Sequence, residues 1–516
     1  MTAATTGSFM LVLHTHMPFL KNAGRWPVGE EWLFQAWGEA YLPVIDVLER
    51  QGARGRRGVA TLGLTPLVVR QMEDAGLLER FHAWIGHALL RAEMLAANSG
   101  ETGDRVRRRE AASVWWRHYK EMLDRFERRG CELVPSLRAL AETGTVEVLG
   151  GPATHPYLPL HDDTTVHAQV CLGLDEAERS LGVRPGGIWL PECAYRPGLE
   201  DVLEGCGVTH VLLDGPTVLQ AGGFPAIRRA WSLGDSQVCA LGRDLEVSYR
   251  VWSPTGGYPG HGAYREYHRW EWETGMKLWR VTDKTVAQAD KEWYDPALVD
   301  TAIEAQVDDF TRLLRQSIHS SGDAVVACYD TELFGHWWLE GPRWLERLLD
   351  EVHDAAGDGV LATTTPAAYL ADVGAAGTLR PPAGSWGLRK DFSVWDNDAT
   401  AHIWKELAEL DDRFRDAVVR VGSSVTGTAA ARLLVQACRE LYLAQCSDWP
   451  FMIGHDKSVD YAQERFRVHA DACVRCLDAL AHPPEEAPSW LHELESGHDV
   501  LPGLTPAALT TLYRQP

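Results

Sequence analysis

Two carboxylates set among tryptophans are the side chains best placed to do chemistry in this chain. Glu192 follows Trp189-Leu190-Pro191, and Asp330 begins a segment that ends in Trp337-Trp338. Each acid comes directly after a run typical of a buried strand. One carboxylate can attack or stabilise an anomeric carbon while the other manages the proton, and flat aromatic faces stack on sugar rings. The pair therefore predicts cleavage or transfer at a sugar linkage.

Glu332 is a second candidate for the proton-transfer role. It lies two residues after Asp330, so the two side chains share one face of an extended segment. The residues alone do not choose between them. Asp330 could also serve only as the cap of a helix that begins near Leu333.

Three histidines occupy similar positions after predicted strands. His14 and His16 project from one face of a strand end, and His155 lies in the turn-rich segment 150–157. The first two could bind a metal, donate hydrogen bonds to sugar hydroxyls, or be ordinary structural residues. His155 could bind a hydroxyl or simply shape its loop.

The chain has 21 tryptophans, and several lie near polar turns, where they could form sugar platforms rather than core. These are Trp26, Trp270, Trp272, Trp337, Trp338, Trp386, Trp395 and Trp449.

Short apolar runs alternate with helical stretches, which predicts a parallel sheet. The runs are Phe9–His14, Val59–Leu64, Val146–Leu149, Gly187–Leu190, His210–Leu213, Val238–Leu241, Ala324–Tyr329 and Val360–Thr363. Polar residues follow the carboxyl ends of these strands, among them Asp214. Because active sites of closed barrels lie at that end, this placement favours a barrel over an open sheet.

Three regions are predicted along the chain. Residues 1–77 and 143–375 form the barrel, and residues 78–142 read as a charged, helical insertion. Residues 374–387 are rich in Gly, Ala and Pro and read as a linker. Residues 376–516 carry helical patterns at Ala401–Glu409, Ala429–Cys446 and Tyr461–Leu480, which predict a C-terminal α-helical domain.

Composition excludes several function classes. A net charge of −22 disfavours nucleic acid and anionic membranes as partners. No apolar run reaches transmembrane length, and Met1–Ser8 lack the features of a signal peptide, so we expect a cytoplasmic protein. The ten cysteines are expected to be reduced and mostly buried; only Cys473 and Cys476 have metal or redox spacing, within a helical pattern. Phosphate-loop, dinucleotide and nucleophile-elbow motifs are absent from the sequence.

Separated motifs resemble, in order, the conserved regions of glycoside hydrolase family 57, and most closely those of its 1,4-α-glucan branching enzymes. They are His14–Pro18, Gly151–Pro156, Trp189–Cys193, Tyr329–Trp338, the residues from Trp395 onward, and Ser447–Phe451, which resembles a signature of the helical C-terminal domain.

The resemblance implies a distorted (β/α)7 barrel with an inserted helical subdomain and a C-terminal α-helical domain that contributes to the cleft. It also implies a retaining mechanism that needs no metal or cofactor. Glu192 would be the nucleophile and Asp330 the acid/base. A 6-hydroxyl of an acceptor chain would then displace Glu192 to make an α-1,6 branch. The substrate-binding residues implied are His14, His16, Trp26, His155, Arg265, Trp270, His336, Trp386, Trp395 and Asp448.

The implied partner is an α-1,4-glucan such as glycogen, amylose or a methylated glucan precursor, bound by a monomer or small homo-oligomer. Family members also carry a tyrosine that shields the intermediate from water, and Tyr249 or Tyr258 could supply it. The alternatives are a 4-α-glucanotransferase or α-amylase of the same family, a metal-dependent, deacetylase-like hydrolase, and a non-catalytic carbohydrate-binding protein.

Overall fold

Two five-stranded sheets form the centre of the protein in a computed structural model, which describes residues 7–26, 28–97, 103–253, 256–320, 322–356, 361–422, 427–481 and 485–514. The first sheet is parallel and contains β3 (Val146–Leu149), β2 (Ala60–Leu64), β1 (Gly7–Thr15), β8 (Ala324–Asp330) and β9 (Leu361–Thr363). The second contains β10 (Thr378–Leu379), β6 (Ala230–Leu233), β7 (Cys239–Gly242), β5 (His210–Leu213) and β4 (Gly187–Ile188).

Short backbone contacts join the two sheets into a distorted barrel. The Gly150 amide donates to the Gly187 carbonyl at 3.0 Å, which links the end of β3 to β4. On the other side, the Asp244 amide after β7 donates to Val326 of β8 at 2.8 Å. The parallel strands β1, β2, β3, β4, β5, β7 and β8 therefore follow one another around a closed circuit, as expected for a (β/α)7 barrel.

Alternation along the strands separates two apolar environments. Met10 and Val12 of β1 face the barrel interior, where they pack with Trp189, Leu241 and Val326. The neighbouring positions Phe9, Leu11 and Leu13 face outward into a larger cluster formed with the surrounding helices. Burial on both faces explains why these strands read as continuous apolar runs.

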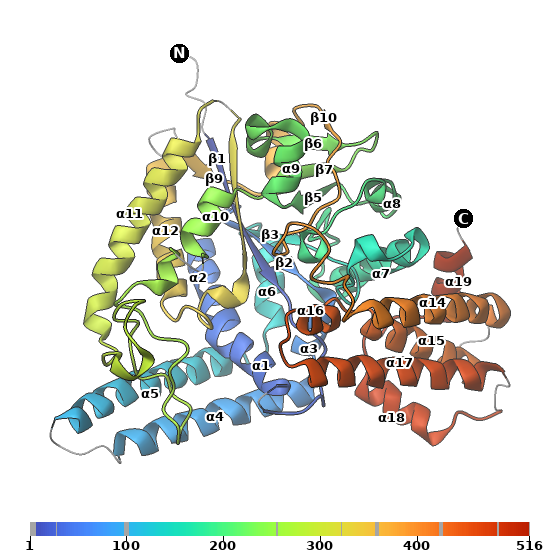
Figure 1. Cartoon of the computed structure of the whole chain (residues 1–516), viewed down its shortest axis with the longest axis horizontal. Coiled ribbons are helices and arrows are strands. Elements are labelled where there is room, and N and C mark those ends of the chain that lie inside the picture. The colour runs from blue at the N-terminus through green and yellow to red at the C-terminus, as the bar shows by residue number, and fades with distance from the viewer. Residues whose placement is uncertain are drawn as a thin grey trace.

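Helices cover the outside of the barrel (Figure 1). They are α1 (Glu30–Gln35), α2 (Leu42–Ala53), α3 (Pro66–Met72), α6 (Val134–Glu142), α7 (Asp163–Leu181), α8 (Leu199–Gly205), α9 (Gly215–Gly222), α10 (Leu245–Val251), α11 (Val299–Ser317), α12 (Gly341–Ala355) and α13 (Pro366–Asp372). The π-helical segment Ala36–Tyr41 lies between α1 and α2.

The long helices α4 (Ala75–Ala97) and α5 (Asp104–Arg128) pack together as a hairpin below the barrel (Figure 1). Their buried residues, including Phe81 and Met122, belong to the same apolar cluster as α2. The hairpin thus shares a core with the barrel, and the exact domain boundaries stay a prediction.

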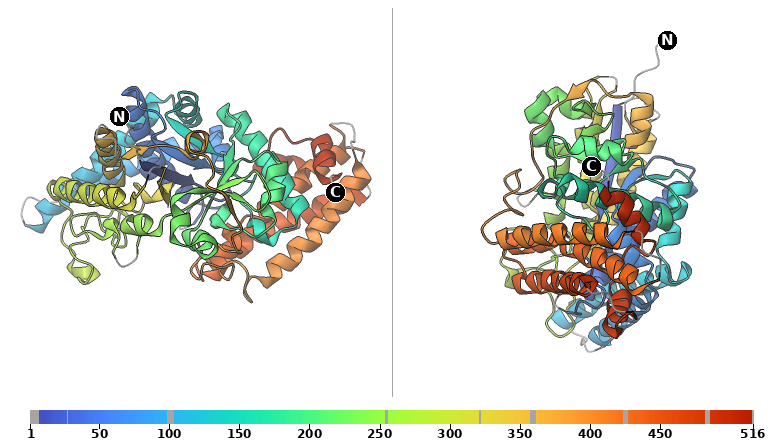
Figure 2. Two further views of the ribbon diagram at one scale, coloured as in Figure 1. Left: turned by 90° about the horizontal axis from the view of Figure 1, so that it is seen from above. Right: turned by 90° about the vertical axis from the view of Figure 1, so that its right-hand side faces the viewer.

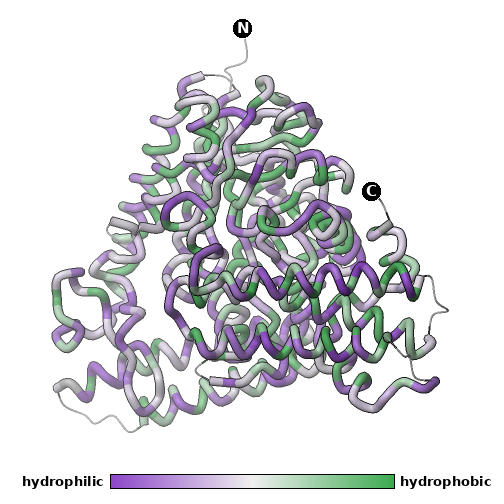
Figure 3. The backbone as a smooth tube through the Cα atoms, turned by 45° about the vertical axis from the view of Figure 1, so that its right-hand side comes forward, coloured by the Kyte–Doolittle hydropathy of each residue, from purple (hydrophilic) through white to green (hydrophobic). Residues whose placement is uncertain are grey.

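The C-terminal region forms a helical bundle beside the barrel (Figures 1 and 2). It contains α14 (Ala401–Val421), α15 (Ala429–Ala444), α16 (Asp448–Gly454), α17 (Val459–Ala481), α18 (Ser489–Gly497) and α19 (Pro506–Arg514). Hydrophobic and hydrophilic residues alternate along its outer helices (Figure 3), and the apolar faces build a separate core. Phe19 and Ala153, from two loops of the barrel, insert into that core and fix the bundle against the site.

The predicted strands are present with small changes of boundary, and Val360 lies outside the described residues. The C-terminal helices are also present, but α14 runs to Val421 rather than ending at Glu409. β6 and β10 were not expected. β10 has only two residues and lies within the segment predicted to be a linker, where no periodicity can form. Among the described residues, the helices are all too short or too polar to cross a membrane.

Candidate active site

Glu192 is held in an uncommon backbone conformation at the end of β4. It lies in the short 3-10 turn Pro191–Cys193 with φ 61° and ψ 21°, the left-handed region that non-glycine residues rarely adopt. The Trp386 indole donates to one carboxylate oxygen at 2.8 Å, and the Ser447 hydroxyl donates to the other at 3.4 Å. The Trp386 amide also donates to the Glu192 carbonyl at 3.0 Å. These contacts fix a strained residue, as is common at functional sites.

Asp330 ends β8 with its side chain exposed. It precedes the 3-10 turn Thr331–Leu333, but its carboxylate does not cap that turn, so the capping interpretation is wrong. The Thr331 hydroxyl pairs with the Thr15 hydroxyl at 2.8 Å, which ties the end of β8 to the end of β1. Asp330 is therefore free to face the site rather than to serve local structure.

Both carboxyl groups have raised pKa values. Burial raises the pKa of Glu192 to about 8, and the charges of Asp448 and Asp330 add to the effect against the Trp386 hydrogen bond. The Asp330 carboxylate reaches solvent, but the protein groups crowded around it partly desolvate it and raise its pKa to about 6, while Arg243 and His16 act in the opposite direction. The charge of Asp330 raises the pKa of Glu192, so the two carboxylates are close enough to interact and we assign them to one site.

We expect a bell-shaped pH dependence of kcat/KM from this pair. The two acids together hold two protons below pH 6, one between pH 6 and 8, and none above, given pKa values of about 6 and about 8. A nucleophile and a proton donor need one proton between them, so kcat/KM should rise through about 6 and fall through about 8. Such limbs belong to the pair rather than to either residue. Rates across pH at low substrate concentration test this, and a profile flat from pH 5 to 9 would contradict it.

A chain of hydrogen bonds connects three site residues to Glu192. The His14 Nε2 and His155 Nε2 atoms are 3.2 Å apart, and His155 Nδ1 is 2.9 Å from the Ser447 hydroxyl. Burial holds the pKa of His14 and of His155 well below its usual range, so both rings are neutral. His14 Nδ1 has no partner among the described residues, which fits a proton on Nε2. His14 then donates to His155, His155 to Ser447, and Ser447 to Glu192.

The C-terminal bundle supplies a second contact to the same histidines. Asp448, which begins α16, accepts a hydrogen bond from His16 Nε2 at 2.9 Å, while His16 Nδ1 lies 3.1 Å from the Thr65 hydroxyl. Burial opposes ionisation of Asp448, but the nearby His16 ring holds its pKa below the usual value. The His16 ring stacks on His155 with centroids 3.7 Å apart. The site is therefore shared between the barrel and the bundle.

Glu332 and His336 are held by the π-helical segment. Tyr41 donates a hydrogen bond to Glu332, and burial together with the Asp330 charge raises the Glu332 pKa to about 8. Glu39 pairs with His336 Nδ1 at 2.6 Å. Gly335 permits this approach, because its φ is 125° and a Cβ there would collide with the Glu39 carbonyl.

A buried charge cluster is also present, and sequence reasoning noted only one of its members, Asp214. Arg243 lies 3.4 Å from the buried carboxylate of Asp214, and Lys390 pairs with the same carboxylate at 2.9 Å. The Arg243 guanidinium lies 5.3 Å from the ring centre of Trp386, the residue that holds Glu192. Arg243 follows β7 directly, so its place after a strand was the available signal. Ser447 was seen only as part of a motif.

A cavity of about 1450 Å³ adjoins this site, and its lining includes His16, Glu332 and Asp448. Arg265, His336 and Trp337 also line it, whereas Glu192 and Asp330 are not among the lining residues. Arg265 is buried and donates to the His336 carbonyl at 2.6 Å, so part of its hydrogen-bonding capacity is occupied by the cavity wall.

Three of the substrate-binding tryptophans that the resemblance implies lie elsewhere. So do three other candidate platforms: Trp272 is exposed but does not line the cavity, and Trp338 and Trp449 are buried. Trp395 is fully buried and stacks on Tyr157 with centroids 4.6 Å apart, so it supports the site from within the core and offers sugar no face. Trp26 is exposed beside a separate depression of about 470 Å³. Trp270 is exposed, but it is not one of the residues that line the main cavity. Spacing cannot separate these three from Trp386, which does reach Glu192.

Two family profiles match most of the chain. The profile described as glycosyl hydrolase family 57 matches residues 10–380. The profile described as 1,4-alpha-glucan branching enzyme, C-terminal, matches residues 406–508, which include Ser447 and Asp448.

Individual relatives agree with this placement. A Mycobacterium tuberculosis protein named probable 1,4-alpha-glucan branching enzyme is 38% identical over 513 residues, covering 92% of each chain. The crystal structure of a branching enzyme from Thermococcus kodakaraensis superposes with a TM-score of 0.90 at 29% identity, covering 99% of this chain and 97% of that one. The alpha-amylase AmyC from Thermotoga maritima superposes with a TM-score of 0.86 at 26% identity, covering 98% and 99%.

Proposed function

The chain belongs to glycosyl hydrolase family 57, and from this premise we propose that it is a 1,4-α-glucan branching enzyme. The observation that carries the proposal is the placement of Ser447 and Asp448. They come from the region that matches the branching-enzyme C-terminal profile, and they bind His155 and His16 of the barrel. That region is thus part of the candidate site rather than an appendage.

The first step of the proposed reaction is attack by Glu192. Its carboxylate displaces the leaving glucan from the anomeric carbon while Asp330 gives a proton to the departing oxygen. The hydrogen bonds from Trp386 and Ser447 hold the attacking carboxylate in place, and Ser447 is itself oriented by the two neutral histidines. The bond broken is α-1,4, and the bond formed joins the sugar to Glu192.

The second step transfers the chain. The ionised Asp330 accepts the proton of an acceptor 6-hydroxyl, whose oxygen attacks the anomeric carbon and releases Glu192. The product contains an α-1,6 linkage with retained configuration. Arg243, which lowers the Asp330 pKa, favours the ionised form that this step needs.

Water must be kept from the intermediate, and the structure supports Tyr249 over Tyr258 for that role. Tyr258 is buried and donates to Asp309 at 2.8 Å. Tyr249, on α10, is half-exposed, and Arg243 lies 5.9 Å from its ring centre.

We place the donor and acceptor glucans in the cavity lined by Trp337 and Arg265. Which α-glucan is used in the cell, a cytoplasmic location, and a monomeric or small oligomeric state stay predictions.

Incubation with amylose tests the function. We expect new α-1,6 linkages, counted by proton NMR, to outnumber new reducing ends. The likeness to AmyC supports an α-amylase as the second candidate, which would make reducing ends without branches. A 4-α-glucanotransferase would redistribute chain lengths without branches. Either result would overturn the proposal.

A further inference from the structure

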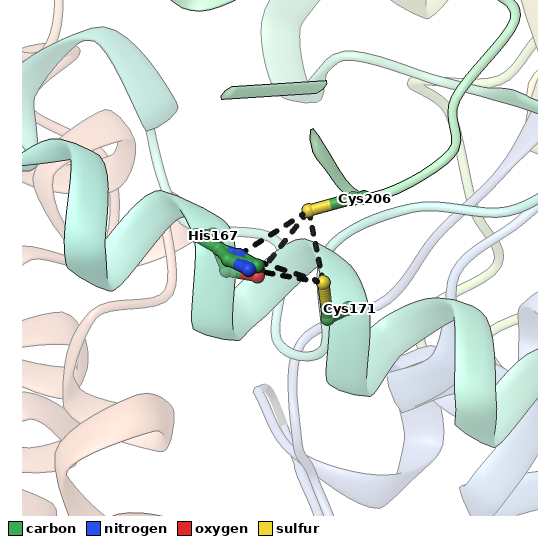
Figure 4. A group of neighbouring side chains, drawn as sticks. All are labelled: His167, Cys171 and Cys206. Atoms are coloured by element: carbon green, nitrogen blue, oxygen red, sulfur yellow. Dashed lines mark hydrogen bonds between the residues drawn. The ribbon is translucent and has the colours of Figure 1, made fainter. Parts of the chain in front are cut away.

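A histidine and two cysteines converge on the outer side of the barrel, away from the carboxylates. His167 and Cys171 lie one turn apart on α7, and Cys206 caps the end of α8 (Figure 4). Their donor atoms all lie within 4.8 Å of one another. Cys206 is buried and the other two are half-buried, so the cluster is both sheltered and reachable from solvent.

We propose that His167, Cys171 and Cys206 bind a zinc ion that ties α7 to the end of α8. Nitrogen and thiolate sulfur are the donors that zinc prefers. For tetrahedral zinc with Zn–S of about 2.3 Å and Zn–N of about 2.0 to 2.1 Å, the sulfur–nitrogen separation is about 3.6 Å. His167 Nδ1 lies 3.7 Å from both sulfurs, close to that separation. Nε2 is also 3.8 Å from Cys171, so the ring must turn to direct Nδ1 at the ion.

The two sulfur atoms are the part that must move. They are 2.9 Å apart, whereas tetrahedral zinc would hold them at about 3.8 Å and a disulfide at about 2.05 Å. The sulfur separation alone does not favour either outcome. The ring favours the metal. Helical spacing already brings His167 close to Cys171, but a disulfide does not require Nδ1 to lie at the same 3.7 Å from Cys206 on another helix.

Binding is balanced by proton release. Zinc replaces the protons of the Cys171 and Cys206 thiols, and two protons leave to solvent for each ion bound. Three protein donors leave a fourth position for water. Asp175, one further turn along α7, is exposed and paired with Arg184 at 2.5 Å, so it is engaged elsewhere.

Two other groups of possible ligands are less suited to an added ion. Glu440 already pairs at 2.8 Å with each of His469 and His498, and Asp448 pairs with His16 at 2.9 Å. Their carboxylates are satisfied by strong hydrogen bonds, whereas sulfur makes only weak ones.

The tether would serve the active site indirectly. α7 follows the loop that carries His155, and α8 follows the turn that carries Glu192. Joining these helices would stabilise both loops in the folded state, as structural zinc does elsewhere. The proposal is independent of the proposed function and leaves the carboxylate chemistry free of metal.

Metal content of the full chain, purified under reducing conditions without chelator, tests the site. We expect one zinc per chain by elemental mass spectrometry, and at least a tenfold loss in Cys171→Ser, Cys206→Ser and His167→Ala. Cys239→Ser, a half-buried cysteine outside the cluster, is the matched control and should keep the metal. Removal of zinc should lower the midpoint of thermal unfolding while leaving the branching rate at low temperature unchanged.

Cobalt substitution keeps the test valid if a variant folds poorly. Wild-type protein loaded with Co²⁺ should show thiolate-to-cobalt charge transfer and the strong visible bands of tetrahedral cobalt. A spectrum without thiolate bands would overturn the proposal, as would full zinc content in the Cys171→Ser, Cys206→Ser double variant. Metal-free wild-type protein that is two hydrogens lighter by mass would instead identify a disulfide, and would also overturn it.

Discussion

Glu192→Gln should lower the branching rate by about 10⁴-fold or more, because an amide oxygen cannot form the glycosyl-enzyme. The fold should be retained. The glutamine carbonyl can still accept from Trp386, which now donates at 2.8 Å, and its NH₂ group can donate to Ser447. The measurement is the rate of α-1,6 linkage formation from amylose, with the near-ultraviolet circular dichroism spectrum as the check on folding.

Glu110→Gln is the matched control for this substitution. Glu110 is exposed on α5 and does not line the cavity beside the candidate site, so the change should leave the rate unaltered. A fluorinated glycosyl fluoride that traps the intermediate should label wild-type protein at Glu192 and leave the variant unlabelled. If Glu192→Gln keeps its rate within tenfold, Glu192 is not the nucleophile, and a non-catalytic carbohydrate-binding protein becomes the better reading.

The barrel was predictable because its strands are buried on both faces. Runs such as Val146–Leu149 and His210–Leu213 carry that burial directly in their composition, and the structure places strands at those residues. The position of acids after strands was equally visible. β6 was not, because its four residues include the polar Ser232, and Trp231 and Ser232 are only half-buried.

The contacts that complete the site could not be predicted, since each joins distant parts of the chain. His336 meets Glu39 across 297 residues, and Asp214 meets Arg243 across 29. The zinc cluster is similar, because Cys206 lies 35 residues from Cys171, outside the spacing of short metal motifs. For Trp395 the sequence predicted a contact with substrate that the structure does not have, because the residue is buried. A buried tryptophan and a sugar platform look alike in sequence, and only the packed structure separates them.

Asp330→Asn and Glu332→Gln should show which of the two residues transfers the proton. Asp330 is exposed and interacts with Arg243 and His16, whereas Glu332 accepts a hydrogen bond from Tyr41. We expect Asp330→Asn to lower branching of amylose by roughly 10²- to 10⁴-fold, the usual contribution of general acid–base catalysis. Glu332→Gln should cost less than tenfold, because its partner can donate to an amide oxygen as well.

An activated donor makes the distinction specific to proton transfer. Fluoride leaves without a proton, so Asp330→Asn should still release a burst of fluoride from α-maltosyl fluoride and then stall, because the base for the second step is missing. Azide, which attacks without a base, should restart turnover in this variant and have no effect on Glu332→Gln. The same burst and azide rescue in Glu332→Gln instead would assign the proton to Glu332. In that case the Tyr41 contact, rather than Arg243 and His16, would tune the acid.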